Sequence, residues 1–153
     1  MIEIRRFRVD DAPAVAALER VLFSVPYDVP WSQRTVAAYA GTDHRLGWIA
    51  DDSGTVRGYL LASMVLDEAN IDAIGVDPSV QRQGIARRLL NCALAHFTEC
   101  GVREVWLEVA VRNAAAHAFY LNAGFTEVAR RRNYYRGPTE TCDAVVMRLI
   151  LTP

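Results

Sequence analysis

Hydrophobic positions alternate in some segments of the chain and recur at helical spacing in others, which predicts a mixed α/β protein. Residues 2–7 (IEIRRF) alternate apolar and polar side chains, as a half-buried strand does. The segment after them predicts a helix capped by Asp10 or Asp11. The apolar positions of that helix are Val15, Leu18, Val21 and Leu22.

A break with two prolines at residues 26–30 (PYDVP) ends this helix, and Ser32 can cap a second short helix that extends to about Tyr39. Three strands are expected next, at residues 45–51, 55–66 and 69–76. Because the gaps between these strands are short, we expect them to pair antiparallel.

The second half of the chain predicts a long helix over residues 84–100. Its apolar stripe comprises Ile85, Leu89, Leu90, Ala93, Leu94 and Phe97. A strand at 103–110, a helix capped by Asn113 and two closing strands at 125–135 and 143–151 complete the pattern. The strands on either side of the long helix should be parallel. We therefore predict an α/β (α+β) fold in one domain over residues 1–153: a single mixed sheet of about seven strands with about four helices on both faces.

Composition narrows the class of protein further. The 153 residues contain 17 Lys plus Arg and 18 Asp plus Glu, a balance that argues against a nucleic-acid binder. The three cysteines show no Cys-x-x-Cys spacing and the three histidines no metal-ligand spacing, so reduced thiols and no metal are expected. No signal peptide or membrane-length apolar run is present, so we expect a cytoplasmic protein that does not bind membranes, with a monomer favoured.

Residues 75–90 (GVDPSVQRQGIARRLL) combine a strand end, a glycine loop and the start of the long helix. Free N–H groups and the dipole of a helix N-terminus favour an anion there. Gly84 and Ala86 keep the backbone accessible, and Arg82 and Arg87 could add forked hydrogen bonds to a phosphate, whereas Arg88 is expected to be solvated. The sequence is neither a P-loop nor a dinucleotide-binding turn. On these grounds alone, an ordinary turn with solvated arginines remains an equal alternative.

Residues 81–86 (QRQGIA) resemble the Gln/Arg-x-x-Gly-x-Gly/Ala signature of the GNAT acetyltransferase superfamily. Within that superfamily, four segments resemble the bacterial ribosomal-protein-alanine N-acetyltransferases: residues 66–90, 106–125, 131–135 and 143–147. The resemblance implies a GNAT fold, in which two parallel strands splay apart at a cofactor cleft. It also implies acetyl-CoA as the co-substrate. The positions that would bind this molecule are Ile74, Gly75, Val76, Arg82, Gln83, Gly84, Ile85, Ala86, Arg87 and Asn113.

Acetyl transfer to an amine requires a base and a proton donor for the departing thiolate. The resemblance assigns the base to Glu108 and the donor to Tyr120. A phenol has a pKa of roughly 10 and is therefore protonated at neutral pH. The alternative for Glu108 is an ordinary surface glutamate, and the alternative for Tyr120 is an aromatic anchor on a short helix.

The resemblance also suggests which residues contact the acceptor: Trp31, Glu68, Tyr134 and Tyr135. Tyr27 and Asp67 could assist them. The predicted function is direct acetyl transfer to a protein N-terminal amino group, with the N-terminal alanine of a ribosomal protein favoured. A small-molecule amine or a protein lysine is the alternative acceptor. A coenzyme-binding module without catalysis is a third reading.

Overall fold

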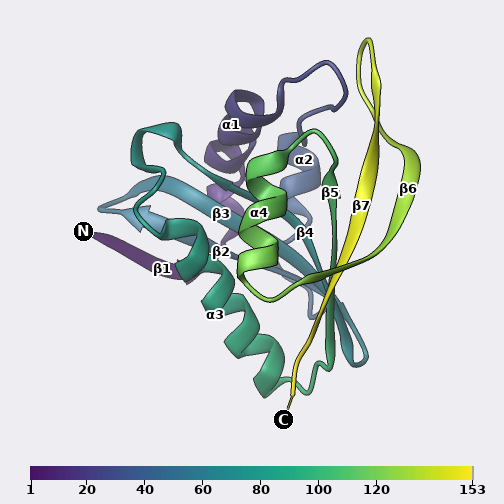
Figure 1. Cartoon of the computed structure of the whole chain (residues 1–153). Helices are drawn as coiled ribbons and strands as arrows, with labels where there is room; N and C mark the ends of the chain where they lie inside the picture. Colours follow the sequence, from purple (N-terminus) through teal and green to yellow (C-terminus); the bar gives the residue numbers. More distant parts are fainter. Residues whose placement is uncertain (153) are drawn as a thin grey trace.

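The computed structural model describes residues 1–152, and its centre is a mixed sheet of seven strands (Figure 1). The strand order across the sheet is β1-β2-β3-β4-β5-β7-β6. The strands are β1 (Ile2–Arg6), β2 (Arg45–Asp52), β3 (Thr55–Val65), β4 (Glu68–Val76), β5 (Glu104–Ala110), β6 (Thr126–Arg136) and β7 (Thr141–Ile150). β4 and β5 pair in parallel, and the other described pairs are antiparallel. The predicted order of elements along the chain, the parallel pair on either side of the long helix and the fold class are confirmed.

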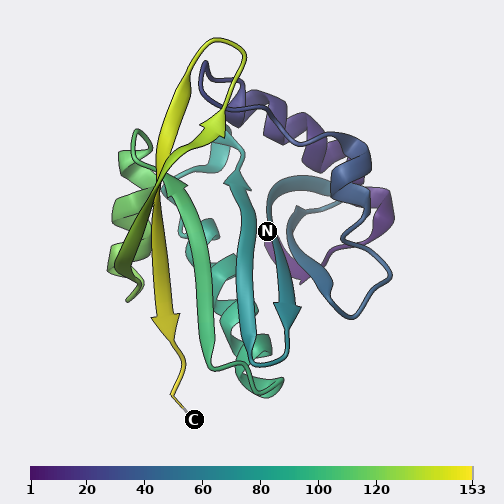
Figure 2. The same ribbon diagram turned by 90° about the vertical axis from the view of Figure 1, so that its right-hand side faces the viewer.

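Helices cover both faces of the sheet, as predicted (Figure 2). The helices are α1 (Ala12–Phe23), α2 (Gln33–Ala37), α3 (Ile85–Glu99) and α4 (Ala114–Asn122). Ser32 caps α2 by accepting the N–H of Thr35, and Asn113 caps α4 by accepting the N–H of Ala116. α1 and α2 lie on one face, and α3 and α4 lie on the other.

Each face of the sheet has its own hydrophobic core. Leu89, Leu90 and Phe97 of α3 are fully buried against one face. Val15 of α1 and Val36 of α2 are fully buried against the other. Fully burying one such side chain stabilises the fold by about 1.5–3 kcal/mol, so the two cores fix the helices on the sheet.

The parallel strands β4 and β5 stay paired over three positions only. The last pair is Asn70 with Trp106, and β4 continues beyond it without a partner on that side. A bulge in β4 lies just after this point, because Ala62 pairs with Ile71 and Leu61 pairs with Ala73, which leaves Asp72 unpaired. Bulges bend a strand and increase its twist. The two strands diverge from here (Figure 2), which confirms the predicted splayed pair.

Three details of the sequence prediction are corrected. Val21 is 66% exposed and does not belong to the buried face of α1. Asp11 does not cap α1, because its carboxylate accepts the N–H of Arg8 and pairs with Arg5 at 2.8 Å. Arg88 is not merely solvated, since its Nη2 donates to the carbonyl of Ile2 at 2.8 Å and ties α3 to β1.

Candidate active site

A cavity of about 580 Å³ lies where β4 and β5 separate. The side chains around it come from both faces of the sheet. They include Glu19, Tyr27, Asp28, Trp31, Tyr39, Arg45, Ser63, Asn70, Asp72, Ile74, Glu108, Asn113, Tyr120, Tyr134 and Tyr135. Because the split connects the α1–α2 side of the sheet to α4, two molecules can approach one point from opposite sides.

Glu108 of β5 enters this cavity because its neighbours in the strand point the other way. Leu107 and Val109 are buried, whereas the Glu108 side chain is 20% exposed and lies 3.6 Å from Arg131. Burial is the main cause that raises the pKa of Glu108 above its usual value, while the charge of Arg131 partly opposes the rise. A carboxylate with a raised pKa is a stronger base than a solvated one, as the predicted role requires.

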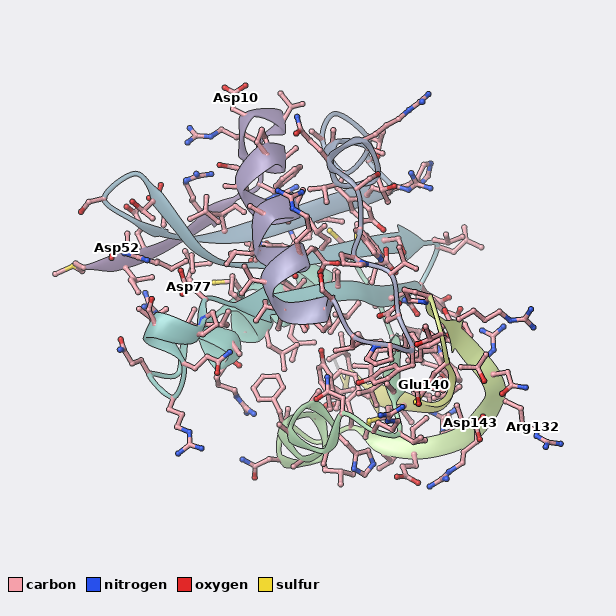
Figure 3. All side chains as sticks on the ribbon, turned by 90° about the horizontal axis from the view of Figure 1, so that it is seen from above. Asp10, Asp52, Asp77, Arg132, Glu140 and Asp143 are labelled. Atoms are coloured by element: carbon pink, nitrogen blue, oxygen red, sulfur yellow. The ribbon has the colours of Figure 1, made fainter. Side chains whose placement is uncertain are left out.

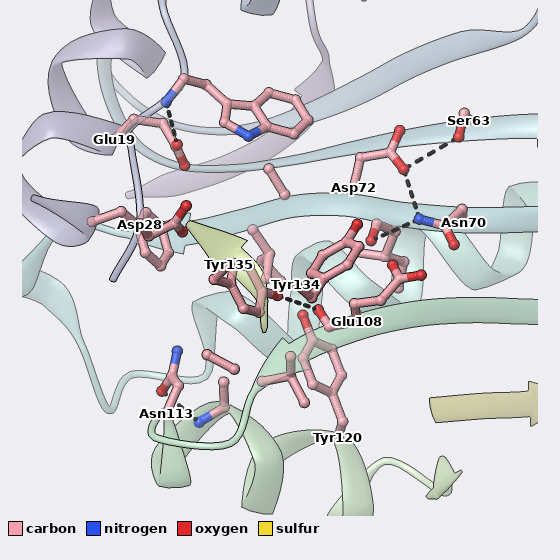
Figure 4. A pocket seen from close by; sticks show the side chains of 18 of the residues that line it. Glu19, Asp28, Ser63, Asn70, Asp72, Glu108, Asn113, Tyr120, Tyr134 and Tyr135 are labelled. Atoms are coloured by element: carbon pink, nitrogen blue, oxygen red, sulfur yellow. Dashed lines mark hydrogen bonds between the residues drawn. The ribbon is translucent and has the colours of Figure 1, made fainter. Parts of the chain in front are cut away.

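Tyr120 of α4 is 4% exposed and faces the same cavity as Glu108 (Figure 4). Its ring packs between Phe119 and Phe125, with centroid distances of 5.2 and 5.5 Å. Its hydroxyl makes no hydrogen bond to any described residue. Burial raises the pKa of Tyr120, so the phenol keeps its proton throughout the neutral range.

The predicted aromatic residues of the acceptor site all line the cavity. Tyr135 donates its hydroxyl proton to the carbonyl of Glu108 at 3.1 Å and so fixes the backbone of β5. Tyr134 is 41% exposed and stacks edge-to-face on Tyr135 at 5.0 Å. Trp31 lies opposite, where its backbone N–H donates to Glu19 at 3.0 Å. These residues can therefore shape the place where an acceptor enters.

The loop before α2 and the β6–β7 hairpin meet above these aromatic residues. The carbonyl of Pro26 accepts the N–H of Glu140 at 3.0 Å. Gly137 lies so close that an added Cβ would come within 2.3 Å of the same carbonyl. Arg112 joins the two segments, because it stacks on Tyr27 at 4.6 Å and pairs with Glu140 at 3.2 Å. Figure 3 shows Glu140 at this hairpin, with Asp143 and Arg132 nearby.

The other side of the split can hold an extended, peptide-like ligand. Beyond Asn70, β4 keeps β3 as its neighbour but has no partner on the β5 side, so its backbone groups there are free to bind a ligand. Ile74 lines the cavity at this edge. Gly75 has no room for a side chain, because an added Cβ would lie 2.6 Å from Leu22 Cδ1 and from the Tyr59 hydroxyl.

The N-terminus of α3 has the features of an anion site. Gly84 precedes the helix with φ +76° and no side chain caps the first turn, so the amides of Ile85 and Ala86 are left without a helical partner. Arg82 and Arg87 are exposed, and neither is paired with a described residue. Gln81 holds the loop by donating to the carbonyl of Val76 at 3.1 Å. The neighbouring Gln83 is exposed in the same loop.

One predicted substrate residue lies apart from the rest. Glu68 is at the start of β4, where the strand is still paired with β5, and it borders a separate shallow depression beside Trp106. Its position in the strand places it before the split. The structure therefore does not bring Glu68 together with Glu108 and Tyr120.

Several polar residues of the cavity were not predicted from the sequence: Glu19, Asp28, Tyr39, Arg45, Ser63, Asn70 and Asp72. Two of them have a local signal. Glu19 follows Val15 by four residues, so it lies on the buried face of α1, where it is 3% exposed. Asp72 is a lone carboxylate inside an otherwise apolar part of β4. For Tyr39 and Ser63, the local sequence holds no signal.

Residues 13–125 match the acetyltransferase (GNAT) family. The chain is a member of the GNAT family. It is 36% identical over 149 residues to the [ribosomal protein bS18]-alanine N-acetyltransferase of Escherichia coli K12, covering 97% of each chain. It is 39% identical over 142 residues to the N-alpha-acetyltransferase RimI of Mycobacterium tuberculosis, covering 90% of this chain and 85% of that protein.

A solved structure of the same class confirms the GNAT fold. The crystal structure of the ribosomal-protein-S18-alanine N-acetyltransferase from Escherichia coli superposes with a TM-score of 0.89 at 35% identity. The superposition covers 100% of this chain and 96% of that chain. This GNAT enzyme is therefore an acyltransferase of the N-acetyltransferase type.

Within the described residues 1–152, no helix is long and apolar enough to cross a membrane. The same residues contain no group of three or more His, Cys, Asp or Glu side chains arranged to hold a metal ion.

Proposed function

We propose that this GNAT enzyme transfers the acetyl group of acetyl-CoA to the N-terminal α-amino group of a protein. The favoured acceptor is the N-terminal alanine of a ribosomal protein, as the names of its relatives state for those proteins. Such an acceptor places the reaction in the cytoplasm. The observation that carries the proposal is the cavity at the β4–β5 split, where Glu108 and Tyr120 lie between an aromatic acceptor side and an open strand edge.

The residues on the coenzyme side fit acetyl-CoA. The free edge of β4 suits the amide groups of the pantetheine arm, and the uncapped N-terminus of α3 with Arg82 and Arg87 suits a pyrophosphate. Asn113 borders the same cavity while capping α4, so it can serve both roles. When bound, acetyl-CoA supplies the reactive thioester.

Two side chains of the enzyme manage the protons. An α-amino group has a pKa of roughly 7.7–8.0 and must lose a proton to react. We assign the removal of that proton to the carboxylate of Glu108. Tyr120 donates its phenolic proton to the departing sulfur, because its buried hydroxyl keeps the proton at neutral pH. The nitrogen loses its second proton to solvent as the amide forms, and proton exchange with solvent returns both side chains to their starting states.

The acceptor is tested by incubating the enzyme with acetyl-CoA and a peptide panel, followed by mass spectrometry. The panel contains peptides that begin with alanine, serine or methionine, and peptides with a blocked N-terminus and a free lysine. We expect acetylation of the free N-termini, with alanine the fastest. Acetylation confined to the blocked lysine peptides would overturn the proposal.

A further inference from the structure

Asp72 of β4 and Glu108 of β5 lie at the same level on the two sides of the strand split. Each follows by two residues the last paired position, Asn70 with Trp106. Both side chains line the cavity, and Figure 4 shows Glu108 between Asp72 and Tyr120. We propose that Asp72 binds the positively charged amino group of the acceptor and so delivers it to Glu108. This inference rests on the proposed function above.

The carboxylate of Asp72 is held in place by three donors, which come from the turn after α2, from β3 and from β4 itself. Oδ2 accepts the hydroxyl of Tyr39 at 2.7 Å, and Oδ1 accepts the side-chain amide of Asn70 at 2.7 Å and the hydroxyl of Ser63 at 3.3 Å. All three donors are uncharged. They orient the carboxylate without neutralising it, so its negative charge is available to a cation in the cavity.

The charged groups around Asp72 do not cancel this charge. Arg45 lines the cavity, but its guanidinium lies over the ring of Tyr39 at 5.6 Å and forms no ion pair with a described carboxylate. Arg131 is engaged with Glu108 at 3.6 Å. Glu108 and Tyr134 face Asp72 from β5 and β6. Tyr135 and Arg136 of β6 line the same cavity, and Arg136 Nε donates to the carbonyl of Asn133 at 3.2 Å. This end of the cavity therefore attracts a cation.

Tyr120, at the other end of the cavity, is consistent with an acceptor amine that passes from Asp72 to Glu108. Tyr120 is 4% exposed. Its hydroxyl forms no hydrogen bond with a described residue. Because Tyr120 lines the cavity, its hydroxyl is available to donate to a bound ligand. Asp72, Glu108 and Tyr120 thus form a line from the charged amine, through the proton acceptor, to the proton donor (Figure 4).

The steps balance along this line. The acceptor arrives as an ammonium group bound to Asp72, and one of its N–H protons passes to Glu108. The freed lone pair forms the new C–N bond to the acetyl carbon, the C–S bond breaks, and the sulfur receives the proton of Tyr120. As the amide forms, the nitrogen loses its second proton, which passes through solvent to the Tyr120 phenolate, while Glu108 releases its own proton to solvent. Asp72 begins and ends the reaction as a carboxylate.

The variant Asp72→Asn tests the proposal, because it keeps the shape of the side chain and removes the charge. At about pH 7, where the α-amine is charged, we expect the KM of an alanine-starting peptide to rise about tenfold. We expect kcat to fall less than about threefold. At about pH 9.5 the amine is neutral, and the KM ratio of variant to wild type should fall below about two.

Tyr39→Phe provides a second variant that keeps the carboxylate and removes one of its donors. Tyr39→Phe should raise the KM of the alanine-starting peptide by a smaller factor than Asp72→Asn does, and this increase should also disappear at about pH 9.5. Glu99→Gln changes the net charge equally at an exposed position at the end of α3, and it should leave both constants unchanged. Melting temperatures of all variants report whether the fold is kept.

Three outcomes would decide against the role of Asp72. A KM within twofold of wild type at neutral pH overturns the inference, as does a KM increase of equal size at both pH values. An equal loss of kcat in both Asp72→Asn and Glu108→Gln, with KM unchanged, would do the same. The proposed function survives all three, because it requires only that the wild-type enzyme acetylates free N-termini. If no free N-terminus is acetylated, both proposals fail.

Discussion

Asn70 of β4 and Trp106 of β5 form the last paired position of the two parallel strands. Beyond this pair, the backbone edge of β4 is free, and side chains of both strands face one cavity. A sheet that stayed closed would bury this edge in hydrogen bonds and leave no opening. The bulge at Asp72 therefore creates the place where acetyl transfer is proposed to occur.

Replacing the proposed base should abolish most of the chemical step. Glu108→Gln removes the proton acceptor while keeping the size of the side chain, so kcat should fall by about 10²–10⁴-fold. Acetyl-CoA should bind with unchanged Kd. Glu104→Gln is the matched control on the same strand, since Glu104 pairs with Arg148 outside the cavity. Steady-state kinetics that give equal kcat values for these two variants would exclude the role of Glu108.

The pH profile of kcat should carry the signature of a buried carboxylate. Burial raises the pKa of Glu108, and a base works only when ionised, so activity should decline as the pH falls through this raised pKa. The acid limb should therefore lie above the usual glutamate pKa of about 4.3. The profile of Glu108→Gln should lack the limb. If the acid limb persists in Glu108→Gln, a group other than Glu108 causes the loss of activity at low pH.

Removing the hydroxyl of Tyr120 should slow the departure of the thiolate. Tyr120→Phe keeps the ring between Phe119 and Phe125, so we expect the melting temperature to change little. We expect kcat to fall by about 10²-fold, because a general acid contributes roughly that much. Calorimetric titration should show that acetyl-CoA still binds. A fully active Tyr120→Phe enzyme would mean that the tyrosine is only an aromatic anchor.

The arginines beside α3 should differ in their effect on coenzyme affinity. Arg82→Ala and Arg87→Ala each remove an exposed cation that is paired with no residue of the described part of the chain. Each should raise the Kd of acetyl-CoA by about fivefold, since exposed charge pairs contribute at most about 1 kcal/mol. The effect should shrink at high salt. Arg88→Ala serves as the control, because its guanidinium is bound to the carbonyl of Ile2. Equal losses of affinity in all three variants would contradict separate roles.

The buried carboxylate of Glu19 should make stability depend on pH. Burial is the main cause that raises the pKa of Glu19, although Tyr59 and the N–H of Trp31 donate to it. The folded state therefore holds this proton to higher pH than the unfolded state does. The free energy of unfolding should consequently fall as the pH rises from the unfolded pKa through the raised folded pKa.

Urea denaturation at a series of pH values checks this expectation. In Glu19→Gln the decline should be smaller, because the side chain no longer ionises. Glu3→Gln, at an exposed position on β1, should behave as the wild type does. Identical pH dependence in Glu19→Gln and the wild type would show that Glu19 does not carry the effect.

Helical spacing located the buried face of α1 only in part. Val15 and Leu18 are buried as predicted, whereas Val21 is exposed and the charged Glu19 is buried in its place. Periodicity identifies which positions of a helix share a face. It cannot identify a carboxyl group that is buried because residues distant in sequence donate hydrogen bonds to it. Here the partners are Tyr59 of β3 and the backbone of Trp31, which are 40 and 12 residues away.

The acceptor side of the site shows a similar division. Glu68 and Asp72 lie on one strand, and the sequence favoured Glu68 through resemblance to a family. The structure places Asp72 in the cavity and Glu68 beside a paired stretch of β4. The difference arises from a single bulge, whose position depends on the register of β3 against β4. A register is a property of two segments, so the pattern of one strand does not contain it.

The sequence by itself determined the order of the helices and strands, the caps at Ser32 and Asn113, the parallel neighbours of α3 and membership of the GNAT family. These features depend on local spacing and on motifs that are contiguous in the chain. Only the tertiary structure decided where β4 and β5 separate, and which side chains meet there. That decision requires strand register and contacts between α1, α2, β3 and β6, which are far apart in sequence and are brought together only by packing on the sheet.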